Sequence, residues 1–305
     1  SLPFRSADIE RSLGAAIGRQ TLAAGKEVKV DLARAEATCF VEVTATRALI
    51  YHKKIPGSGG LPTGTAGKLV CLLSGGFDSA VAAYKIIRRG VRLSFVHFYG
   101  APARAGEDSP PIARELVRTL TSYQGLSRLY LVPFTDIQRE IVVGAPESCR
   151  ILLYRRFMLR IGERLAYREG AHGVVTGDSI GQVASQTLHN MQAVGDVASL
   201  PVHRPLVGDD KQEILDLARR IGTYDISSEP FTDCCPMFLP KKPELFATAE
   251  QLTAAESKLD VPALVQLGVS FSFKEVYEYR LGEVRLKTAK THEPGKRQTT
   301  AQLVG

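Results

Sequence analysis

A glycine-rich stretch in the first third of the chain carries residue types that can hold phosphate groups. It reads SGGFDS and covers residues 74–79. Gly75 and Gly76 can adopt positive φ and let backbone amides approach an anion closely, while the flanking serine hydroxyls can donate hydrogen bonds. A carboxylate beside phosphates is repulsive unless it binds Mg²⁺ or orients a nucleophile, so Asp78 favours Mg²⁺-dependent chemistry. The alternative is a plain turn in which Asp78 caps a helix.

The elements around this stretch alternate between apolar strands and amphipathic helices. The pattern predicts strands at 69–73, 93–98, 129–134 and 173–177, and helices within 79–90, 113–120, 148–168 and 214–221. Nearly all-apolar strands in such an alternation indicate an α/β fold with a doubly wound, mostly parallel sheet that is buried on both faces. Because these sheets bind ligands at the carboxyl ends of their strands, the stretch at 74–79 lies where a ligand site is expected.

The remaining segments predict a second, smaller unit and a C-terminal extension. The pattern predicts a helix at 6–20 and strands at 28–32, 39–43 and 47–52, which make a small α+β unit. We therefore divide the chain into an α+β unit at 1–56, a glycine-rich linker at 57–68, a catalytic domain at 69–245 and an extension at 246–305. Within the extension we expect helical structure at 250–259 and a mobile basic tail at 288–301.

Composition limits the classes of function. The net charge of +7 and the pI near 9.2 favour an acidic partner such as nucleic acid. The sequence has no apolar run long enough to span a membrane and no secretory signal at its start, so we expect a cytoplasmic protein with no membrane partner. Its five cysteines include no C-x-x-C pair, which argues against a disulfide framework and a zinc knuckle.

Five segments together resemble the tRNA 4-thiouridine-forming sulfurtransferases, which are PP-loop ATPases with a THUMP domain. In chain order they are GGLPTGTAGK at 59–68, SGGFDS at 74–79, TGDSIGQVASQT at 176–187, HRPLVG at 203–208 and DKQEI at 210–214. The resemblance implies an adenine nucleotide alpha hydrolase-like PP-loop domain, a partial THUMP unit at 1–56 and no rhodanese domain. In this family ATP converts a tRNA uridine into its adenylate with release of pyrophosphate, and a persulfide sulfur then displaces AMP to give 4-thiouridine.

The resemblance also implies roles for individual residues. Asp78, Lys211 and Cys235 match catalytic positions, and a lysine suits this role because its charge can offset negative charge on the α-phosphate. For Lys211 the alternative is a solvated residue in the first turn of a helix, and for His97 it is a hydrogen-bonded core residue. The residues that correspond to the ATP-binding set are Leu73, Ser74, Gly75, Gly76, Phe77, Asp78, Ser79, His97, Phe98, Gly177, Asp178 and Gln186.

The sulfur step calls for a cysteine. Cys235 matches a position where the family commonly has the cysteine that resolves the persulfide, and a cysteine desulfurase that delivers persulfide to Cys235, or free sulfide, could supply the sulfur. Without a C-x-x-C pair we predict no iron–sulfur cluster. Cys149 is an alternative disulfide partner, the role of Cys234 stays open, and we expect Cys39 and Cys71 to be buried structural thiols.

Basic residues suggest where RNA could bind. The candidates are Lys53 and Lys54 in the small unit and Arg156, Arg160 and Arg164 on the predicted helix at 148–168, where they form either a phosphate track or a solvated face. The expected cofactors are ATP and Mg²⁺, and the expected partners are tRNA, a cysteine desulfurase and a second copy of the chain. Two other functions remain open, namely a different AMP-forming PP-loop synthetase that acts on a small molecule and a non-catalytic RNA-binding module.

Overall fold

The computed structural model describes residues 5–31, 33–100, 111–229 and 242–291. The chain forms two units, Ser1–Gly57 and Ser58–Gly305. In the first unit, helix α1 spans Ser6–Ala23, and strands β1 (Phe40–Val43) and β2 (Ala48–Tyr51) form an antiparallel pair. The predicted helix and two of the predicted strands are confirmed. The strand predicted at 28–32 is wrong over residues 28–31, whose exposed chain pairs with no other strand there.

A seven-stranded sheet forms the centre of the second unit, in the order β7-β6-β3-β4-β5-β8-β9. The strands are β3 (Lys68–Leu72), β4 (Arg92–Tyr99), β5 (Leu126–Pro133), β6 (Val174–Val175), β7 (Val202–His203), β8 (Phe273–Arg280) and β9 (Glu283–Thr291). The strands from β7 to β5 in this order are parallel, whereas β8 and β9 are antiparallel to their neighbours. This mostly parallel sheet confirms the predicted fold class.

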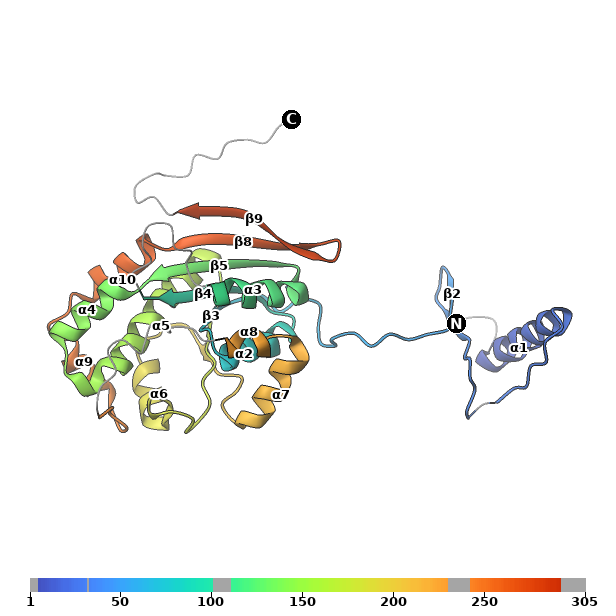
Figure 1. Cartoon of the computed structure of the whole chain (residues 1–305), viewed down its shortest axis with the longest axis horizontal. Helices are drawn as coiled ribbons and strands as arrows, with labels where there is room; N and C mark the ends of the chain where they lie inside the picture. Colours follow the sequence, from blue (N-terminus) through green and yellow to red (C-terminus); the bar gives the residue numbers. More distant parts are fainter. Residues whose placement is uncertain (1–4, 32, 101–110, 230–241, 292–305) are drawn as a thin grey trace, which may run out of the picture. The chain divides into compact units, whose positions relative to one another are not determined.

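The two antiparallel strands at one edge come from the C-terminal stretch (Figure 1). β8 pairs with β5 along its length, and the turn to β9 contains Leu281 and Gly282, both with positive φ. The sequence pattern did not predict this hairpin. A mobile tail is the wrong prediction for residues 288–291, which belong to β9, and residues 292–301 lie outside the described part of the chain.

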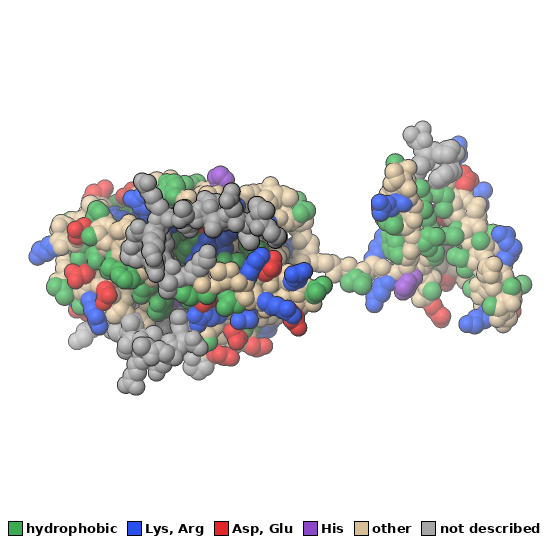
Figure 2. Space-filling model, turned by 90° about the horizontal axis from the view of Figure 1, so that it is seen from above, with side chains coloured by type: hydrophobic (Ala, Val, Ile, Leu, Met, Phe, Trp, Pro, Cys, Tyr) green, Lys and Arg blue, Asp and Glu red, His purple; other side chains and the backbone are tan. Residues whose placement is uncertain are grey.

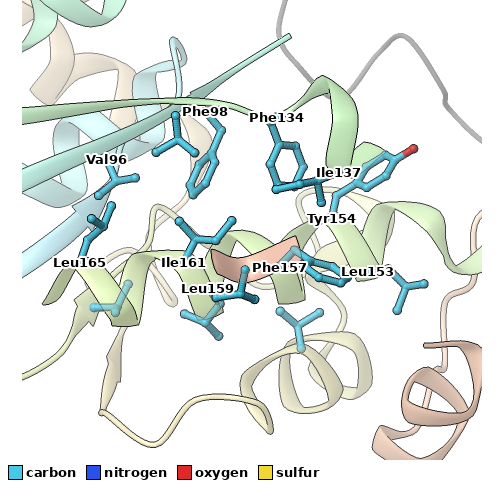
Figure 3. Packing of buried hydrophobic residues seen from close by; sticks show 14 of the residues in the cluster. Val96, Phe98, Phe134, Ile137, Leu153, Tyr154, Phe157, Leu159, Ile161 and Leu165 are labelled. Atoms are coloured by element: carbon cyan, nitrogen blue, oxygen red, sulfur yellow. The ribbon is translucent and has the colours of Figure 1, made fainter. Parts of the chain in front are cut away.

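Helices cover both faces of the sheet and bury two apolar cores. The helices are α2 (Phe77–Ile87), α3 (Pro111–Gln124), α4 (Thr135–Gly144), α5 (Arg150–Glu169), α6 (Leu188–Gly195), α7 (Lys211–Ile221), α8 (Tyr224–Ser228), α9 (Ala249–Ala255) and α10 (Val261–Ser270). Successive strand residues point to opposite faces, so Phe95 joins the core under α2, α3 and α7, while Val96 joins the core under α5. Figure 3 shows Val96 and Phe98 packed beside Ile161 and Leu165 of α5.

The surface mixes charges of both signs. Figure 2 shows lysine and arginine side chains interspersed with acidic and apolar ones on the face in view. Over the described residues, no helix combines the length and the apolar character needed to cross a membrane.

Candidate active site

The glycine-rich loop joins the carboxyl end of β3 to the first turn of α2. The hydroxyl of Ser79 accepts a hydrogen bond from the Ser74 amide at 3.0 Å, and the Gly76 amide donates to Ser74 Oγ at 3.2 Å. These bonds fix the shape of the loop from within. No side chain caps the helix at Gly76, so the first amide groups of α2 keep the donor capacity that helix N-termini offer to anions.

Asp78 lies between two side chains from distant segments. Its Oδ1 accepts a hydrogen bond from Lys211 Nζ at 2.9 Å, and its Oδ2 accepts one from Gln182 Nε2 at 3.1 Å. Lys211 is the first residue of α7, and Asp210 caps that helix by accepting hydrogen bonds from the amides of Gln212 and Glu213. The cap therefore fixes where α7 starts, and the start of α7 places the lysine beside the loop.

Gly177 brings the end of β6 against the glycine-rich loop. A Cβ atom at Gly177 would lie 2.6 Å from the Ser79 amide nitrogen and 2.8 Å from the Asp78 carbonyl carbon. Real Cβ atoms do not come this close to backbone, so only glycine allows the two segments to meet without displacement.

Asp178 is buried next to Gly177 and is held by two arginines. Its carboxylate accepts hydrogen bonds from Arg155 on α5, from Thr176 Oγ1 at 2.8 Å and from Arg204 Nε at 3.4 Å. Burial alone would raise the pKa of this carboxyl, but the charge of Arg155 and the hydrogen bond from Thr176 outweigh it, so the pKa lies below its usual value. Asp178 is thus an anion that orders two cationic side chains.

A cavity of about 470 Å³ opens beside these groups. Its polar lining includes Ser74, Asp78, Arg155, Thr176, Asp178, Ser185, Gln186 and Arg204, and its apolar lining includes Leu72, Ile151, Met158, Leu159, Val194 and Val202. Gln186 donates from Nε2 to Asp178 at 3.4 Å, while its buried Oε1 has no hydrogen-bond partner among the described residues. Apolar walls with a few convergent polar groups are typical of small-molecule sites, and the unused acceptor at Gln186 favours a ligand that can donate a hydrogen bond.

Comparison with known proteins decides the family. The family described as Thiamine biosynthesis protein (ThiI) matches residues 64–261. The chain belongs to the ThiI family. It is 46% identical over 279 residues to the "Probable tRNA sulfurtransferase" of Thermus thermophilus, covering 92% of this chain and 67% of the relative. It is 39% identical over 281 residues to the protein of the same name from Geobacillus kaustophilus, covering 92% and 69%.

A solved structure is similar to the chain as well. It is described as a 4-thiouridine synthetase–RNA complex with bound ATP, and it superimposes with a TM-score of 0.78 at 36% identity. The match covers 90% of this chain and 70% of that one. The chain thus spans about two thirds of the length of its ThiI-family relatives.

Three residues of the predicted ATP-binding set are buried and do not line the cavity. His97 donates a hydrogen bond from Nδ1 to the Leu73 carbonyl oxygen at 2.8 Å. Phe98 packs edge-to-face on Phe134, with ring centroids 5.3 Å apart. Leu73, His97 and Phe98 are all buried, and the hydrogen bond from His97 joins β4 to the residue before the loop.

The sequence did not single out three residues that help to build the site. Arg155 and Arg204 hold Asp178, and Asn190 on α6 binds the turn that lines the cavity. Only Arg204 carried a signal, because it lies in the HRPLVG segment that supports the family resemblance. Arg155 lies beside the predicted arginine track but outside its spacing, and nothing in the sequence distinguishes it.

The predicted arginine track needs a correction. Arg156 is 2% exposed, and it donates to Thr253 Oγ1 at 3.2 Å and pairs with Glu256 at 3.5 Å. Arg160 pairs with both oxygens of the same Glu256 at 2.7 and 2.9 Å. A buried guanidinium paired inside the protein cannot contact a phosphate, so the prediction is wrong for Arg156, and Arg160 is already engaged.

The other predicted RNA contacts remain exposed. Arg164 lies in the last turns of α5, which lead to the amino end of β6, at the opposite edge of the sheet from the glycine-rich loop. Lys53 and Lys54 are exposed in the first unit, where Lys54 Nζ lies 4.6 Å from the centre of the Phe40 ring.

The cysteines differ from one another in their surroundings. Cys235 and Cys234 lie outside the described residues. Cys71 is buried as predicted, and burial raises the pKa of its thiol to about 12. Cys39 is exposed, so the prediction that it is buried is wrong; it precedes β1 at the surface of the small unit. Cys149 is partly buried at the start of α5. Within the described ranges, no group of three His, Cys, Asp or Glu side chains could hold a metal ion.

Proposed function

We propose that this chain is an ATP-dependent tRNA sulfurtransferase that converts a tRNA uridine into 4-thiouridine. The observation that carries the proposal is the Asp78–Lys211 pair at the uncapped N-terminus of α2, beside a cavity of about 470 Å³. Its support from known proteins is the name tRNA sulfurtransferase given to relatives at 46% and 39% identity, and the 4-thiouridine synthetase structure at 36% identity.

ATP would bind with its phosphates on the loop and its nucleoside toward the cavity. The amides at the start of α2 and the loop at 74–79 offer donors to the phosphate oxygens. The buried Oε1 of Gln186 would accept a hydrogen bond from the ligand, and the apolar wall formed by Met158 and its neighbours would contact the base. Phe77 is the first residue of α2, so its backbone amide is one of these donors to the phosphates.

The first chemical step would join the uracil to AMP. The uracil O4 attacks the α-phosphorus, the bond from that phosphorus to the bridging oxygen breaks, and pyrophosphate leaves. Lys211 would offset the negative charge that builds on the α-phosphate. Mg²⁺ typically binds through one or two carboxylates together with substrate phosphates, so Asp78 is the candidate protein ligand, and it would exchange its contact with Lys211 for the ion.

The second step would place sulfur on C4. The terminal sulfur of a persulfide attacks C4, the bond between C4 and O4 breaks, and AMP leaves with that oxygen. The transferred sulfur is then still joined to the inner sulfur of its carrier. A second thiolate attacks that inner sulfur, the bond between the two sulfurs breaks, 4-thiouridine leaves, and a disulfide between the carrier and the attacking cysteine remains. Cys235 is our candidate for the attacking cysteine. The described residues on either side of the segment 230–241 support it. Tyr224 packs on Phe77 at 5.2 Å between ring centroids, and Leu245 accepts a hydrogen bond from Thr187 at 2.7 Å, so both flanks touch the site.

The proposed partners follow from this chemistry. tRNA is the substrate, and a cysteine desulfurase is the proposed donor of the persulfide. We also propose a cytoplasmic location and a homodimer, with RNA contacts from Lys53, Lys54 and Arg164.

Pyrophosphate release from ATP tests the proposal directly. The chain is expected to release pyrophosphate only when unmodified tRNA is present, and Asp78→Asn is expected to abolish that release. Release without RNA, or release that survives the substitution, contradicts the proposed reaction. Mass spectrometry of the tRNA nucleosides then shows whether 4-thiouridine forms.

A further inference from the structure

Large apolar side chains are exposed at the mouth of the cavity. Val183, Leu188, Leu245 and Phe246 form what we call the apolar rim. Leu188 is 63% exposed and Phe246 is 64% exposed. An apolar cluster that remains exposed beside a cavity is typical of a surface that binds a partner.

The backbone under the rim is held in place by buried and partly buried polar groups. Asn190 is fully buried and uses its whole amide, because Nδ2 donates to the carbonyls of Ala184 and Glu244 and Oδ1 accepts from the Ala247 amide. Glu244 Oε1 accepts from the amides of Leu245 and Phe246 at 2.9 and 3.0 Å. The rim is therefore a fixed surface although its side chains are in solvent.

The aromatic ring of Phe246 is held on one side by a neighbouring side chain. Its ring meets the imidazole of His189 at 5.3 Å between centroids, with the ring planes at 78°. This edge-to-face contact orients one ring against the other, while the high exposure of Phe246 leaves it available to a planar ligand.

The rim continues directly into the wall of the cavity. Val183 belongs to both, and the turn that follows, Ala184–Gln186, lines the cavity and is bound by Asn190. The segment 179–189, which contributes Val183 and Leu188 to the rim, contains no Asp, Glu, Lys or Arg. A ligand that reaches the cavity from solvent and presents a flat, weakly polar face fits it best.

We propose that the apolar rim receives an unstacked nucleobase of the RNA, with Phe246 as the stacking residue and Leu188 and Leu245 as its apolar surroundings. Enzymes that act on a base must take it out of the stack, and aromatic side chains hold the freed bases of RNA by stacking. The inference rests on the proposed RNA substrate. It adds that this substrate enters over the rim and that Phe246 positions it without taking part in the chemistry.

The test compares RNA recognition in Phe246→Ala, Phe246→Tyr and a control, Phe271→Ala. Phe271 is also an exposed phenylalanine, but it follows α10, away from the cavity lining. For Phe246→Ala we expect the KM for tRNA in pyrophosphate release, and the Kd for tRNA from fluorescence anisotropy, to rise by about ten-fold, the typical loss for one base–aromatic stack. The KM for ATP should not change, Phe246→Tyr should restore tRNA binding, and thermal unfolding should show that all three variants fold.

Each other outcome has a definite meaning. If Phe246→Ala binds tRNA as tightly as the unaltered chain, or no more weakly than Phe271→Ala does, the inference is overturned. It is also overturned if the substitution impairs only sulfur transfer from a protein persulfide donor, or changes only the oligomeric state, because the rim then binds a protein. If the chain binds tRNA through Phe246 but releases no pyrophosphate, the proposed reaction fails while the inference about the rim holds.

Discussion

Lys211 Nζ lies 2.9 Å from Asp78 Oδ1, although 133 residues separate the two in the chain. The contact joins the first turns of two helices, α7 and α2, at the carboxyl ends of the parallel strands. The lysine charge therefore lies where the phosphates of a nucleotide on the glycine-rich loop would be. The same contact occupies the carboxylate that we propose as the Mg²⁺ ligand.

Replacing Lys211 should impair chemistry more than binding. For Lys211→Ala we expect kcat for pyrophosphate release to fall about 100-fold or more, the usual loss for one group that stabilises charge in the transition state. Steady-state kinetics with saturating ATP and tRNA measures this. Gln212→Ala is the matched control, because Gln212 follows on the same helix and, among the described residues, its side chain binds only Asp216. Equal rates in the two variants would remove Lys211 from the mechanism.

Asp178 should make the stability of the protein depend on pH in the acid range. Its folded-state pKa lies below the usual value of about 3.9, so its stabilising contribution is complete above that pH and is lost as the pH falls through the lower folded pKa. Asp178→Asn should lower the free energy of unfolding at pH 7 by about 3 kcal/mol, because two partly buried cations lose their buried partner. It should also flatten the fall in stability below about pH 4.

Urea unfolding between pH 3 and pH 7 measures both effects. Asp216→Asn is the control, since this carboxylate is exposed and its loss should change little. Curves for Asp178→Asn that run parallel to those of the unaltered protein would show that the carboxylate does not drive the pH dependence.

The sequence predicted the parts of the fold and site that local pattern determines. Alternation of apolar strands and amphipathic helices identified the parallel core of the sheet, and the position of SGGFDS after β3 placed it at a strand end. The β8–β9 hairpin was missed because its strands carry many charged residues and read as surface chain. β8 pairs with β9 on one side and with β5 on the other, and β5 is more than a hundred residues away in the sequence.

Partners of charged side chains were the least predictable feature. Arg155, Arg156 and Arg160 lie on one helix. Arg155 binds Asp178 at the site, whereas the other two pair with Glu256, which directly follows α9. Arg156 and Arg160 share the helical spacing that suggested a phosphate track, whereas Arg155 lies outside it. Which arginine faces a carboxylate depends on the packing of α9 on α5, and a single sequence carries no signal for it.

Gly177 should tolerate no side chain. For Gly177→Ala we expect kcat/KM for ATP to fall about 100-fold, because the new Cβ would push the Asp78–Ser79 peptide away from its position. Gly208→Ala is the control, since a Cβ there meets no atom within 4 Å. Both variants are measured by ATP-dependent pyrophosphate release, and a Gly177→Ala enzyme as active as the control would show that the close approach has no role.

Arg164 should contribute to RNA affinity through charge alone. It is exposed and pairs with no described residue, so Arg164→Glu should weaken tRNA binding and reduce the slope of log Kd against log salt by about one. Fluorescence anisotropy at several salt concentrations gives the slope. Arg139→Glu is the control, an exposed arginine that pairs with Asp136 on α4. The same slope in both variants would exclude a phosphate contact at Arg164.

Replacing Cys235 should leave the adenylation step intact and stop repeated sulfur transfer. The adenylation step needs no thiol, so Cys235→Ser should keep tRNA-dependent pyrophosphate release, whereas repeated thiolation should stop because the disulfide left by the first sulfur transfer is not resolved. Cys149→Ser is the control, since Cys149 directly precedes α5 and is partly buried. The measurement is 4-thiouridine formed per enzyme at increasing time with excess tRNA and a persulfide donor. A plateau near one turnover in Cys235→Ser alone supports the assignment. A plateau in both variants indicates that the two thiols pair. Continued turnover by Cys235→Ser shows that a group other than Cys235 attacks the disulfide.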